Sequence, residues 1–358
     1  MRKRRTLDLL SIGLLTGVVF LLARSNRTAP ASSDTERHSA ESPAAGAASG
    51  TDADSPAQIP IKGWWAVLKR VAFQFNDHRL MAEAASVVFF VLLAIFPAIA
   101  ALVSLYGLFA DPKTISNQLA SLSNVIPGGG LGIIKDQVTR VAGNGGGKLG
   151  FGLAIGLAAS LWSANAGMKA LFDVLNVAYG EREKRGFVRL TLITMGFTVA
   201  SLVFVMLALA AVVVVPIVLH FVGLDNTLTV LVDVLRWPLM LVVVSALLAV
   251  IYRYGPSRQH AHWRWVSWGG GFAAVGWVVV SLAFSYYVSN FGSYNKTYGS
   301  LGAAIGFMTW IWISVMVVLI GAELNAELEH QTARDSTTGE PAPLGERGAS
   351  KADAVAAA

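Results

Sequence analysis

The stretch Gly299–Glu323 reads GSLGAAIGFMTWIWISVMVVLIGAE and carries no charged residue before its final glutamate. A helix rises about 1.5 Å per residue, so about 20 apolar residues are enough to cross the roughly 30 Å hydrocarbon core of a bilayer. The stretch exceeds this requirement. It therefore predicts a transmembrane helix, and it makes lipid the main solvent of this part of the chain.

Five further segments have the same apolar character: residues 81–109, 149–171, 188–222, 229–252 and 265–290. The whole chain is 54% hydrophobic and only 14% charged, whereas soluble domains carry about 25% charged residues. The sequence thus predicts an all-α polytopic membrane protein, a six-transmembrane-helix bundle. Pro97 and Pro216 each remove a helix hydrogen bond, so we expect a kink or an extension beyond the bilayer in the first and third segments.

Lysine and arginine are unevenly distributed among the connections. One side is dense in them, with Lys62, Lys69, Arg70 and Arg79 before the first segment, Arg182, Lys184, Arg185 and Arg189 between the second and third, and Arg253, Arg258 and Arg264 between the fourth and fifth. The short turns on the other side offer only Arg236 and Lys296. Basic residues concentrate in cytoplasmic loops. We therefore expect a multi-pass protein of the bacterial inner (plasma) membrane, with both ends of the six-helix core cytoplasmic.

Residues 1–60 differ in composition from the rest of the chain. A basic start precedes the apolar stretch 9–23, and a segment rich in Ser, Ala, Gly, Pro and Asp comes next. Three interpretations of 9–23 stay open: a short spanning anchor, a cleaved signal segment, or the product of a translation start placed too far upstream. We expect residues 1–60 to form this start and a disordered linker, residues 61–330 a membrane domain, and residues 331–358 a disordered cytoplasmic tail.

Residues 61–75 have the pattern of an amphipathic helix. The apolar residues Trp64, Trp65, Leu68 and Val71 recur at helical spacing, and basic residues occupy other positions on the wheel. Such a helix lies in the membrane interface instead of crossing it. We expect an interfacial helix before the first span, with a plain soluble lead-in helix as the alternative.

Motifs of common enzyme classes are missing from the sequence. It has no phosphate-binding loop, no zinc-binding H-E-x-x-H pair, no G-x-S-x-G nucleophile elbow and no cysteine. His260 and His262 form a His-x-His pair without further ligands nearby, and we interpret them as loop residues that contact lipid phosphates. We expect no enzyme activity, no catalytic residue, no cofactor and no metal site. The Gly302-xxx-Gly306 spacing predicts close helix packing.

Charged and amide side chains in or beside the apolar segments are the candidates for a functional site, because a charge inside hydrocarbon costs at least about 2.5 kcal/mol. They are Glu83, Lys169, Asp173, Asn176, Arg182, Arg253, Glu323 and Asn325, with Glu327 one turn beyond Glu323. The expected orientation places all of them in the cytoplasmic half. Two interpretations stay open: the residues pair with one another as interfacial anchors, or they line a polar, cytoplasm-facing cavity for a charged headgroup or solute.

The turn before the last segment, residues 289–300, is rich in polar aromatics and turn formers on the opposite side. Tyr294 and Tyr298 suit a membrane interface, where the ring is in an apolar layer and the hydroxyl contacts water. An aromatic belt explains them without a specific function. The functional alternative is an outer gate or a docking surface.

Ordered motifs lie along these segments and their connections. They include Leu161-Trp-Ser-Ala164, Tyr252-Arg-Tyr-Gly-Pro256, Tyr294-x-x-x-Tyr298-Gly-Ser300 and Gly321-Ala-Glu-Leu-Asn325. Through them, the chain from about Trp64 to Glu329 resembles the YihY/BrkB family of bacterial inner-membrane proteins. The resemblance implies six transmembrane helices. A ribonuclease label attaches to that family, but this sequence lacks the His and Asp cluster that a zinc-dependent hydrolase requires.

Charges beside the spans, a basic inner rim and the lack of an ATP-binding motif together predict a transporter or lipid-handling permease for an amphipathic or anionic molecule. The alternative is an envelope scaffold that anchors a partner protein and moves nothing. We expect membrane lipids as partners, with an envelope protein or further copies of the chain as additional candidates. The net charge of +6 resides in short loops, so we expect no nucleic acid partner.

Overall fold

The apolar segment 299–323 lies inside one helix of 31 residues, α12 (Ser300–His330). The helix continues past the apolar run because the next residues include the good helix formers Ala, Glu and Leu. Its last turns therefore carry three carboxylates, Glu323, Glu327 and Glu329, all completely buried. Buried carboxylates require partners, so other segments must approach this end of α12.

The computed structural model describes residues 50–107, 149–222, 226–291 and 300–356, which all belong to one compact unit. The stretch 9–23, Tyr294 and Tyr298 lie outside the described residues. Besides α12, the helices are η1 (Pro56–Gln58), α3 (Ile61–Asp77), α4 (Leu80–Gly107), α7 (Leu149–Ala178), α8 (Phe187–Val222), α9 (Asn226–Tyr254) and α10 (Trp263–Phe291).

Four of the described helices are long and apolar enough to cross a membrane. The spans are Phe187–Ala208, Trp237–Tyr254, Trp263–Val288 and Ala304–His330, and α4 adds a shorter apolar stretch, Leu80–Ala94. Large apolar side chains such as Leu207 of α8, Val242 of α9 and Leu282 of α10 are exposed on these helices. Water would disfavour such surfaces, whereas lipid would not. The predicted all-α membrane class is confirmed.

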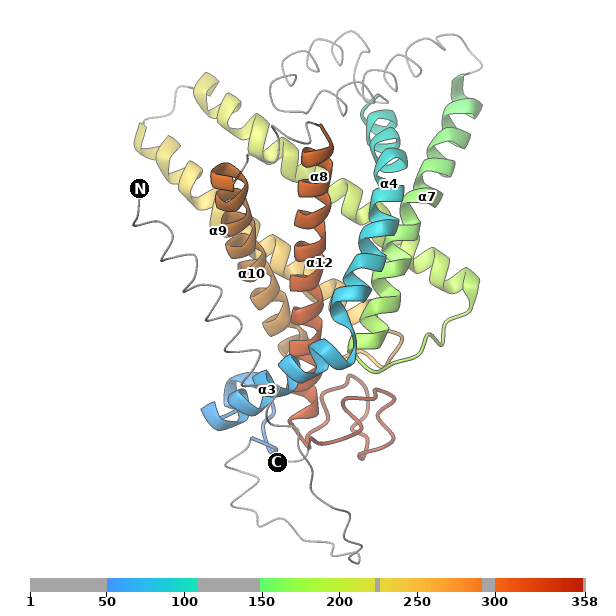
Figure 1. Cartoon of the computed structure of the whole chain (residues 1–358), viewed down its shortest axis with the longest axis vertical. Helices are drawn as coiled ribbons and strands as arrows, with labels where there is room; N and C mark the ends of the chain where they lie inside the picture. The colour runs from blue at the N-terminus through green and yellow to red at the C-terminus, as the bar shows by residue number, and fades with distance from the viewer. Residues whose placement is uncertain (1–49, 108–148, 223–225, 292–299, 357–358) are drawn as a thin grey trace, which may run out of the picture. The chain divides into compact units, whose positions relative to one another are not determined.

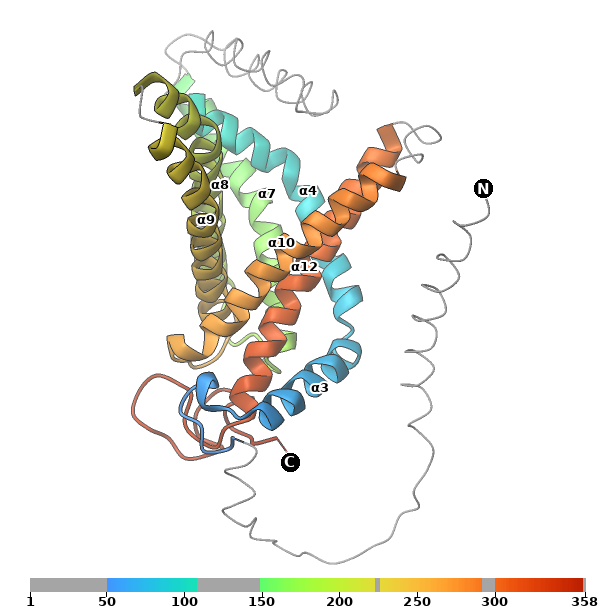
Figure 2. The ribbon, with the colours of Figure 1, turned by 90° about the vertical axis from the view of Figure 1, so that its left-hand side faces the viewer.

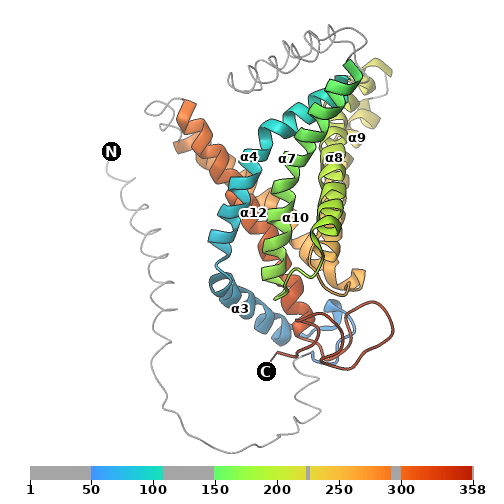
Figure 3. The same cartoon turned by 90° about the vertical axis from the view of Figure 1, so that its right-hand side faces the viewer.

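The long helices pack mainly in neighbouring pairs. α4 runs along α7, and α10 runs along α12 and α9; Figure 3 shows the first pair, and Figure 2 shows α10 with α12. α12 also contacts α4 and α7, so it connects the two groups, while α8 contacts α7 and touches α9 only slightly. Neighbouring helices therefore do not all pack directly against each other, and α8 and α9 leave space between them.

Two glycines permit the close approach of α10 and α12. A Cβ atom on Gly269 would collide with the Gly321 carbonyl oxygen, and one on Gly321 would lie 2.6 Å from the Tyr252 hydroxyl oxygen. Only residues without a side chain fit at this crossing. The packing role that we predicted for Gly306 is not found, because no described atom lies within 4 Å of a Cβ placed there.

Proline does not end the helices that contain it. α4 continues through Pro97, and Figure 3 shows that helix bent along its length. α8 continues through position 216 to Val222, for 36 residues. A helix of that length spans about 54 Å, which exceeds the hydrocarbon thickness of about 30 Å. The sequence predicted a kink or an extension beyond the bilayer for each of these two helices. α4 bends, and α8 is long enough to extend beyond the bilayer.

α3 lies across one end of the long helices (Figure 1), which we call the α3 end. Val67 and Val71 are buried on the side that packs against α12 and α4, whereas Trp65 and Phe73 are exposed. The apolar residues of this helix thus occupy two faces. At Arg79, which has a φ of 50°, the chain turns into α4.

Residues 331–356 differ from the disordered tail that we expected. They fold against the α3 end, and Arg347 and Ala352 are buried. The Arg347 guanidinium donates to the carbonyls of Ala333 and Ala352 at 2.7 and 2.8 Å, and the Asp353 carboxylate accepts the Arg347 N–H at 2.7 Å. Hydrogen bonds from polar side chains hold this segment in place. We expected disorder because the segment has low hydrophobicity, and such hydrogen bonds leave no hydrophobic pattern in the sequence.

Residues 50–60, expected as the end of the linker, also pack at the α3 end, with Ala53 and Ile59 buried. The Thr332 hydroxyl donates to the Ala53 carbonyl at 2.7 Å, and the Ala333 N–H donates to the Thr51 carbonyl at 2.7 Å. The segments that precede and follow the helices therefore bind each other.

Candidate functional site

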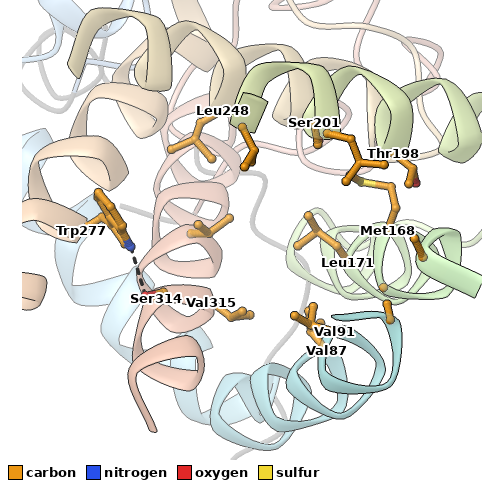
Figure 4. Close-up of a pocket in the computed structure, with 16 residues that line it drawn as sticks. Val87, Val91, Met168, Leu171, Thr198, Ser201, Leu248, Trp277, Ser314 and Val315 are labelled. Carbon is orange, nitrogen blue, oxygen red and sulfur yellow. Dashed lines mark hydrogen bonds between the residues drawn. The ribbon is translucent and has the colours of Figure 1, made fainter. Parts of the chain in front are cut away.

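A cavity of about 390 Å³ lies where the six long helices of the described residues meet. We call it the central cavity, and it is lined by residues that include Val91 of α4, Leu171 of α7, Ser201 of α8, Leu248 of α9, Trp277 of α10 and Val315 of α12. Figure 4 shows these side chains around one space. Protein interiors rarely leave voids larger than a water molecule, whereas ligand pockets measure about 300–1,000 Å³. The central cavity is therefore our first candidate site.

Within the part of the chain that the structure describes, the wall of the central cavity is almost wholly apolar and contains no charged residue. Three of its polar residues, Trp277, Ser314 and Thr198, have hydrogen-bond partners. Trp277 Nε1 donates to Ser314 Oγ at 3.1 Å (Figure 4), and Thr198 Oγ1 donates to Asn165 Oδ1 at 3.2 Å. Such a wall suits the apolar part of a ligand and not an ion.

The carboxylates of α12 form a second, polar cluster at the α3 end. His78, which follows α3, places Nδ1 2.5 Å from Glu323 Oε1. This hydrogen bond is the main cause of the raised pKa of His78. Glu323 Oε2 is buried and has no hydrogen-bond partner among the described residues. The pair leaves one acceptor open.

Glu327 has two cationic partners, an arginine and a lysine, and a histidine as the third. Arg70 Nε of α3 lies 2.7 Å from Oε2, Lys351 Nζ of the C-terminal segment lies 2.6 Å from Oε1, and His330 Nδ1 lies 3.3 Å from Oε2. A buried carboxylate is stable only when charges and hydrogen bonds compensate its desolvation. Glu327 therefore fixes α3 and the C-terminal segment to the end of α12.

Glu329 has its partner in the connection between α9 and α10. Arg258 Nη2 lies 2.6 Å from Glu329 Oε2, and the Arg258 side chain is only 2% exposed. Ser336 Oγ donates to the same carboxylate oxygen at 2.9 Å. These bonds connect the end of α12 and the segment just after it to the distant α9–α10 connection.

Asn176 joins the end of α7 to two connections. Its Oδ1 accepts the Ser257 N–H at 2.7 Å, and its Nδ2 donates to Glu183 Oε2 at 3.1 Å. Arg185 Nε and Nη2 also donate to the two oxygens of Glu183, each at 2.7 Å. Although burial acts in the opposite direction, these bonds lower the pKa of Glu183 to about 2.

The side chains of Asn325 and Arg253 also form hydrogen bonds with backbone groups. Asn325 Oδ1 accepts the Gly269 N–H at 2.7 Å, and its Nδ2 donates to the Val266 carbonyl at 3.1 Å. Arg253 Nη1 donates to a carbonyl of the α9–α10 connection at 2.6 Å, and its guanidinium lies 4.6 Å from the centre of the Trp263 ring. Both residues hold helix ends in place.

The four remaining inner candidates are more accessible. Lys169 Nζ donates to Thr191 Oγ1 at 2.9 Å. Glu83 is half-buried in the first turn of α4, and Asp173 and Arg182 are exposed.

The eight inner candidates therefore do not surround one polar cavity, and none of them lines the central cavity. Glu323, Asn325, Asn176 and Arg253 connect segments at the α3 end. Paired charges are the arrangement that desolvation permits. The outer candidates, Tyr294 and Tyr298, lie outside the described residues.

Sequence reasoning missed the partners of the α12 carboxylates and also Glu329. The partners are His78, Arg70, Lys351 and Arg258, which come from four different segments. A signal was present, because three glutamates in the last turns of one helix require cations from elsewhere. The sequence has no comparable signal for the central cavity. Each helix contributes only a few apolar residues to it, and these resemble the other apolar residues of the same helix.

Within the described ranges, no group of three or more His, Cys, Asp or Glu could hold a metal ion. His260 of the predicted His-x-His pair instead places Nδ1 3.1 Å from the Arg253 carbonyl oxygen. Burial is the main cause of the lowered pKa of His260, and nearby Arg253, Arg258 and Arg185 lower it further.

Known proteins resemble this chain over most of its length. The family model described as virulence factor BrkB matches residues 71–344. The putative ribonuclease-like protein YfkH of Bacillus subtilis is 29% identical over 265 residues, which are 73% of this chain and 94% of that protein. A UPF0761 membrane protein of Methylibium petroleiphilum is 23% identical over 273 residues, 74% of this chain and 62% of that protein. No solved structure gives a significant match.

Proposed function

The chain belongs to the BrkB virulence factor family of membrane proteins, and from this premise we propose that it is a transporter or lipid-handling permease for an amphipathic, anionic molecule. The central cavity is the observation that carries the proposal. A protein that only anchored a partner would gain nothing from an unfilled space among six helices, because lost packing contacts destabilise it.

The chemistry of the cavity and of the α3 end suits the two parts of an amphipathic molecule. The cavity offers apolar walls to a tail. The α3 end offers exposed cations, among them Lys184 and Arg189, to a charged head. In this proposal the buried pairs of Glu323, Glu327 and Glu329 hold the α3 end together, and the ligand itself occupies the cavity.

The proposed topology has six spans, with α4 and α7 added to the four apolar helices. α4 has 28 residues and α7 has 30, so each is about 42–45 Å long and can cross the hydrocarbon core. The basic connections lie at the α3 end. We therefore place that end, and both ends of the helical core, on the cytoplasmic side of the inner membrane.

In the same topology, α3 lies in the membrane interface. Its exposed face carries Ile61, Trp65, Leu68 and Phe73, and Lys69 Nζ lies 5.7 Å from the centre of the Trp65 ring. Apolar and aromatic side chains beside a lysine are typical of interfacial helices. The opposite face of α3 packs on α12, so α3 would connect the membrane surface to the buried carboxylates of α12.

We retain the prediction that the chain is not an enzyme and needs no cofactor. The name ribonuclease-like belongs to the Bacillus relative. Hydrolysis of RNA by a metal enzyme needs a group of metal ligands, and the described residues contain no such group.

Flux of fluorescent lipid analogues in liposomes that contain the purified protein tests the proposal. Val315→Trp places a large ring in the central cavity, whereas Val203→Trp makes the same change on α8 at a position that is 40% exposed and does not line the cavity. We expect Val315→Trp to reduce flux at least about tenfold, the effect of about 1.4 kcal/mol on a barrier, and Val203→Trp to leave it near wild type. Equal fluxes in the two variants would contradict the cavity assignment.

The scaffold alternative makes a different prediction. If the outer turn at residues 289–300 anchors an envelope protein, substitution of Tyr294 and Tyr298 removes a crosslink in cells and leaves lipid flux unchanged. A protein without flux for any anionic or zwitterionic analogue, but with such a crosslink, would favour the scaffold.

A further inference from the structure

A second pocket, of about 490 Å³, lies at the α3 end between the start of α8, the α9–α10 connection and the C-terminal segment. Among the described residues, its lining contains five basic residues and no Asp or Glu. The basic residues are Lys184, Arg185, Arg189, Arg258 and His260. We call it the basic pocket.

The carboxylates near the basic pocket neutralise only part of this charge. Lys184 pairs with Glu181 at 2.9 Å, and Arg185 and Arg258 pair with Glu183 and Glu329 as described above. Arg189 is exposed and has no ion pair or hydrogen-bond partner for its side chain in the described part of the chain. The pocket therefore retains an excess positive charge.

Arg258 supplies a second, independent sign of a missing partner. Its Nε donates to the Gln259 carbonyl at 3.1 Å and its Nη2 to Glu329. Its Nη1 is buried and has no partner among the described residues. An unsatisfied buried donor costs about 1–3 kcal/mol. Because Nη1 is shielded from solvent, an anion relieves that cost only when the guanidinium shifts toward the pocket.

The backbone favours an anion at the same place. α8 begins at Phe187, and the N–H groups in the first turn of a helix lack intrahelical acceptors and carry partial positive charge. Arg189 lies in this first turn. A phosphate there would meet backbone donors together with the cationic side chains, which is the usual combination at phosphate sites.

One wall of the basic pocket is apolar. Ile193 and Phe197 of α8 line it, and the residue after Phe197, Thr198, lines the central cavity. A single stretch of α8 thus contributes to both spaces. A ligand with a charged head and an apolar tail matches this arrangement better than a free ion does.

We infer that the basic pocket binds the phosphate group of an anionic lipid. Only the lipid source of the phosphate rests on the proposed function. The affinity for phosphate rests on the accessible lining cations Arg189 and Lys184 and on the start of α8. The ligand chemistry is a phosphate ester that carries net negative charge.

Binding to the full-length protein in detergent tests this inference without requiring transport. The probes are short-chain phosphatidic acid, short-chain phosphatidylcholine and inorganic phosphate. The test variant is Arg189→Gln. Arg182→Gln is the matched control, because Arg182 is also exposed and unpaired in the described residues but does not line the pocket. Both substitutions lie on the surface, so neither should impair folding.

We expect phosphatidic acid to bind more tightly than phosphatidylcholine, and Arg189→Gln to weaken its binding about tenfold, as the loss of one charged hydrogen bond implies. Arg182→Gln should match wild type. Equal affinities in the two variants, or equal affinities for the two lipids, would overturn the inference. Inorganic phosphate that binds as tightly as phosphatidic acid would overturn the lipid source and keep the phosphate site. Intact binding with no flux in liposomes would contradict the proposed function alone.

Discussion

At the scale of single residues, the pair of His78 and Glu323 should make stability depend on pH. The hydrogen bond raises the pKa of His78 above its ordinary value of about 6.5. The stabilisation is therefore fully present below the unfolded-state pKa and is lost as pH rises through the folded-state value. Burial and Lys351 lower the pKa of His78 and Asp77 raises it, but the hydrogen bond to Glu323 outweighs them.

We predict that the Tm of the wild-type protein in detergent falls between these two pKa values relative to the Tm of His78→Gln. Thermal melting at a series of pH values measures the difference. If the two proteins show the same pH slope, the pair contributes nothing to stability.

The pair of Arg258 and Glu329 should matter much more than an exposed pair. Glu329→Gln leaves the Arg258 charge buried without compensation, which we expect to cost about 3–5 kcal/mol. Lys184, by contrast, is 60% exposed in its pair with Glu181, so Lys184→Gln should cost about 0–1 kcal/mol. Denaturant unfolding of both variants checks the contrast, and a similar small loss in each would show that Arg258 finds another partner or water.

The sequence identified Glu323 and Glu327 as unusual, because charges beside an apolar run are rare. It did not identify their partners. His78 is 245 positions from Glu323, and Lys351 lies in a segment whose composition predicted disorder. Pairs of this kind arise from tertiary structure, and no local pattern encodes them.

At the scale of elements, the crossing of α10 and α12 should tolerate no side chain at Gly269. The added methyl group of Gly269→Ala would collide with the Gly321 backbone, and we expect destabilisation of about 1–3 kcal/mol from overpacking. Gly306→Ala on α12 meets open space, and alanine's higher helix propensity should stabilise it by up to about 1 kcal/mol. Melting curves with opposite signs for the two variants would support this account; equal shifts would count against it.

The positions of the long helices were predictable, but their ends were not. The sixth apolar segment was expected to end at residue 323, whereas α12 ends at His330. The second was expected to end at residue 171, and α7 ends at Ala178. Hydrophobicity reports where lipid surrounds a helix, while helix propensity and capping decide where the helix stops. At the end of α7, Gly180 adopts a φ of 65°, which glycine accommodates without strain.

At the scale of the whole molecule, the proposed topology predicts which side of the membrane the α3 end occupies. The chain has no cysteine, so a single introduced cysteine reports without background. Lys184→Cys should react with a membrane-impermeant thiol reagent only after the cytoplasmic side is opened, whereas Lys296→Cys should react in intact spheroplasts. Labelling of Lys184→Cys in intact spheroplasts would reverse the orientation and move the basic pocket to the outer side.

The central claim is that the cavity shared by the six helices is the path of the transported molecule. The most direct measurement is lipid flux through one sample of Ser201→Cys protein before labelling, after labelling with a bulky disulfide-forming reagent, and after reduction. Ser201 lines the cavity, whereas Val203 does not, so Val203→Cys is the control. Our account predicts that labelling stops flux in Ser201→Cys, that reduction restores it, and that Val203→Cys is unaffected. Unchanged flux through labelled Ser201→Cys, with labelling verified by mass, would contradict the claim.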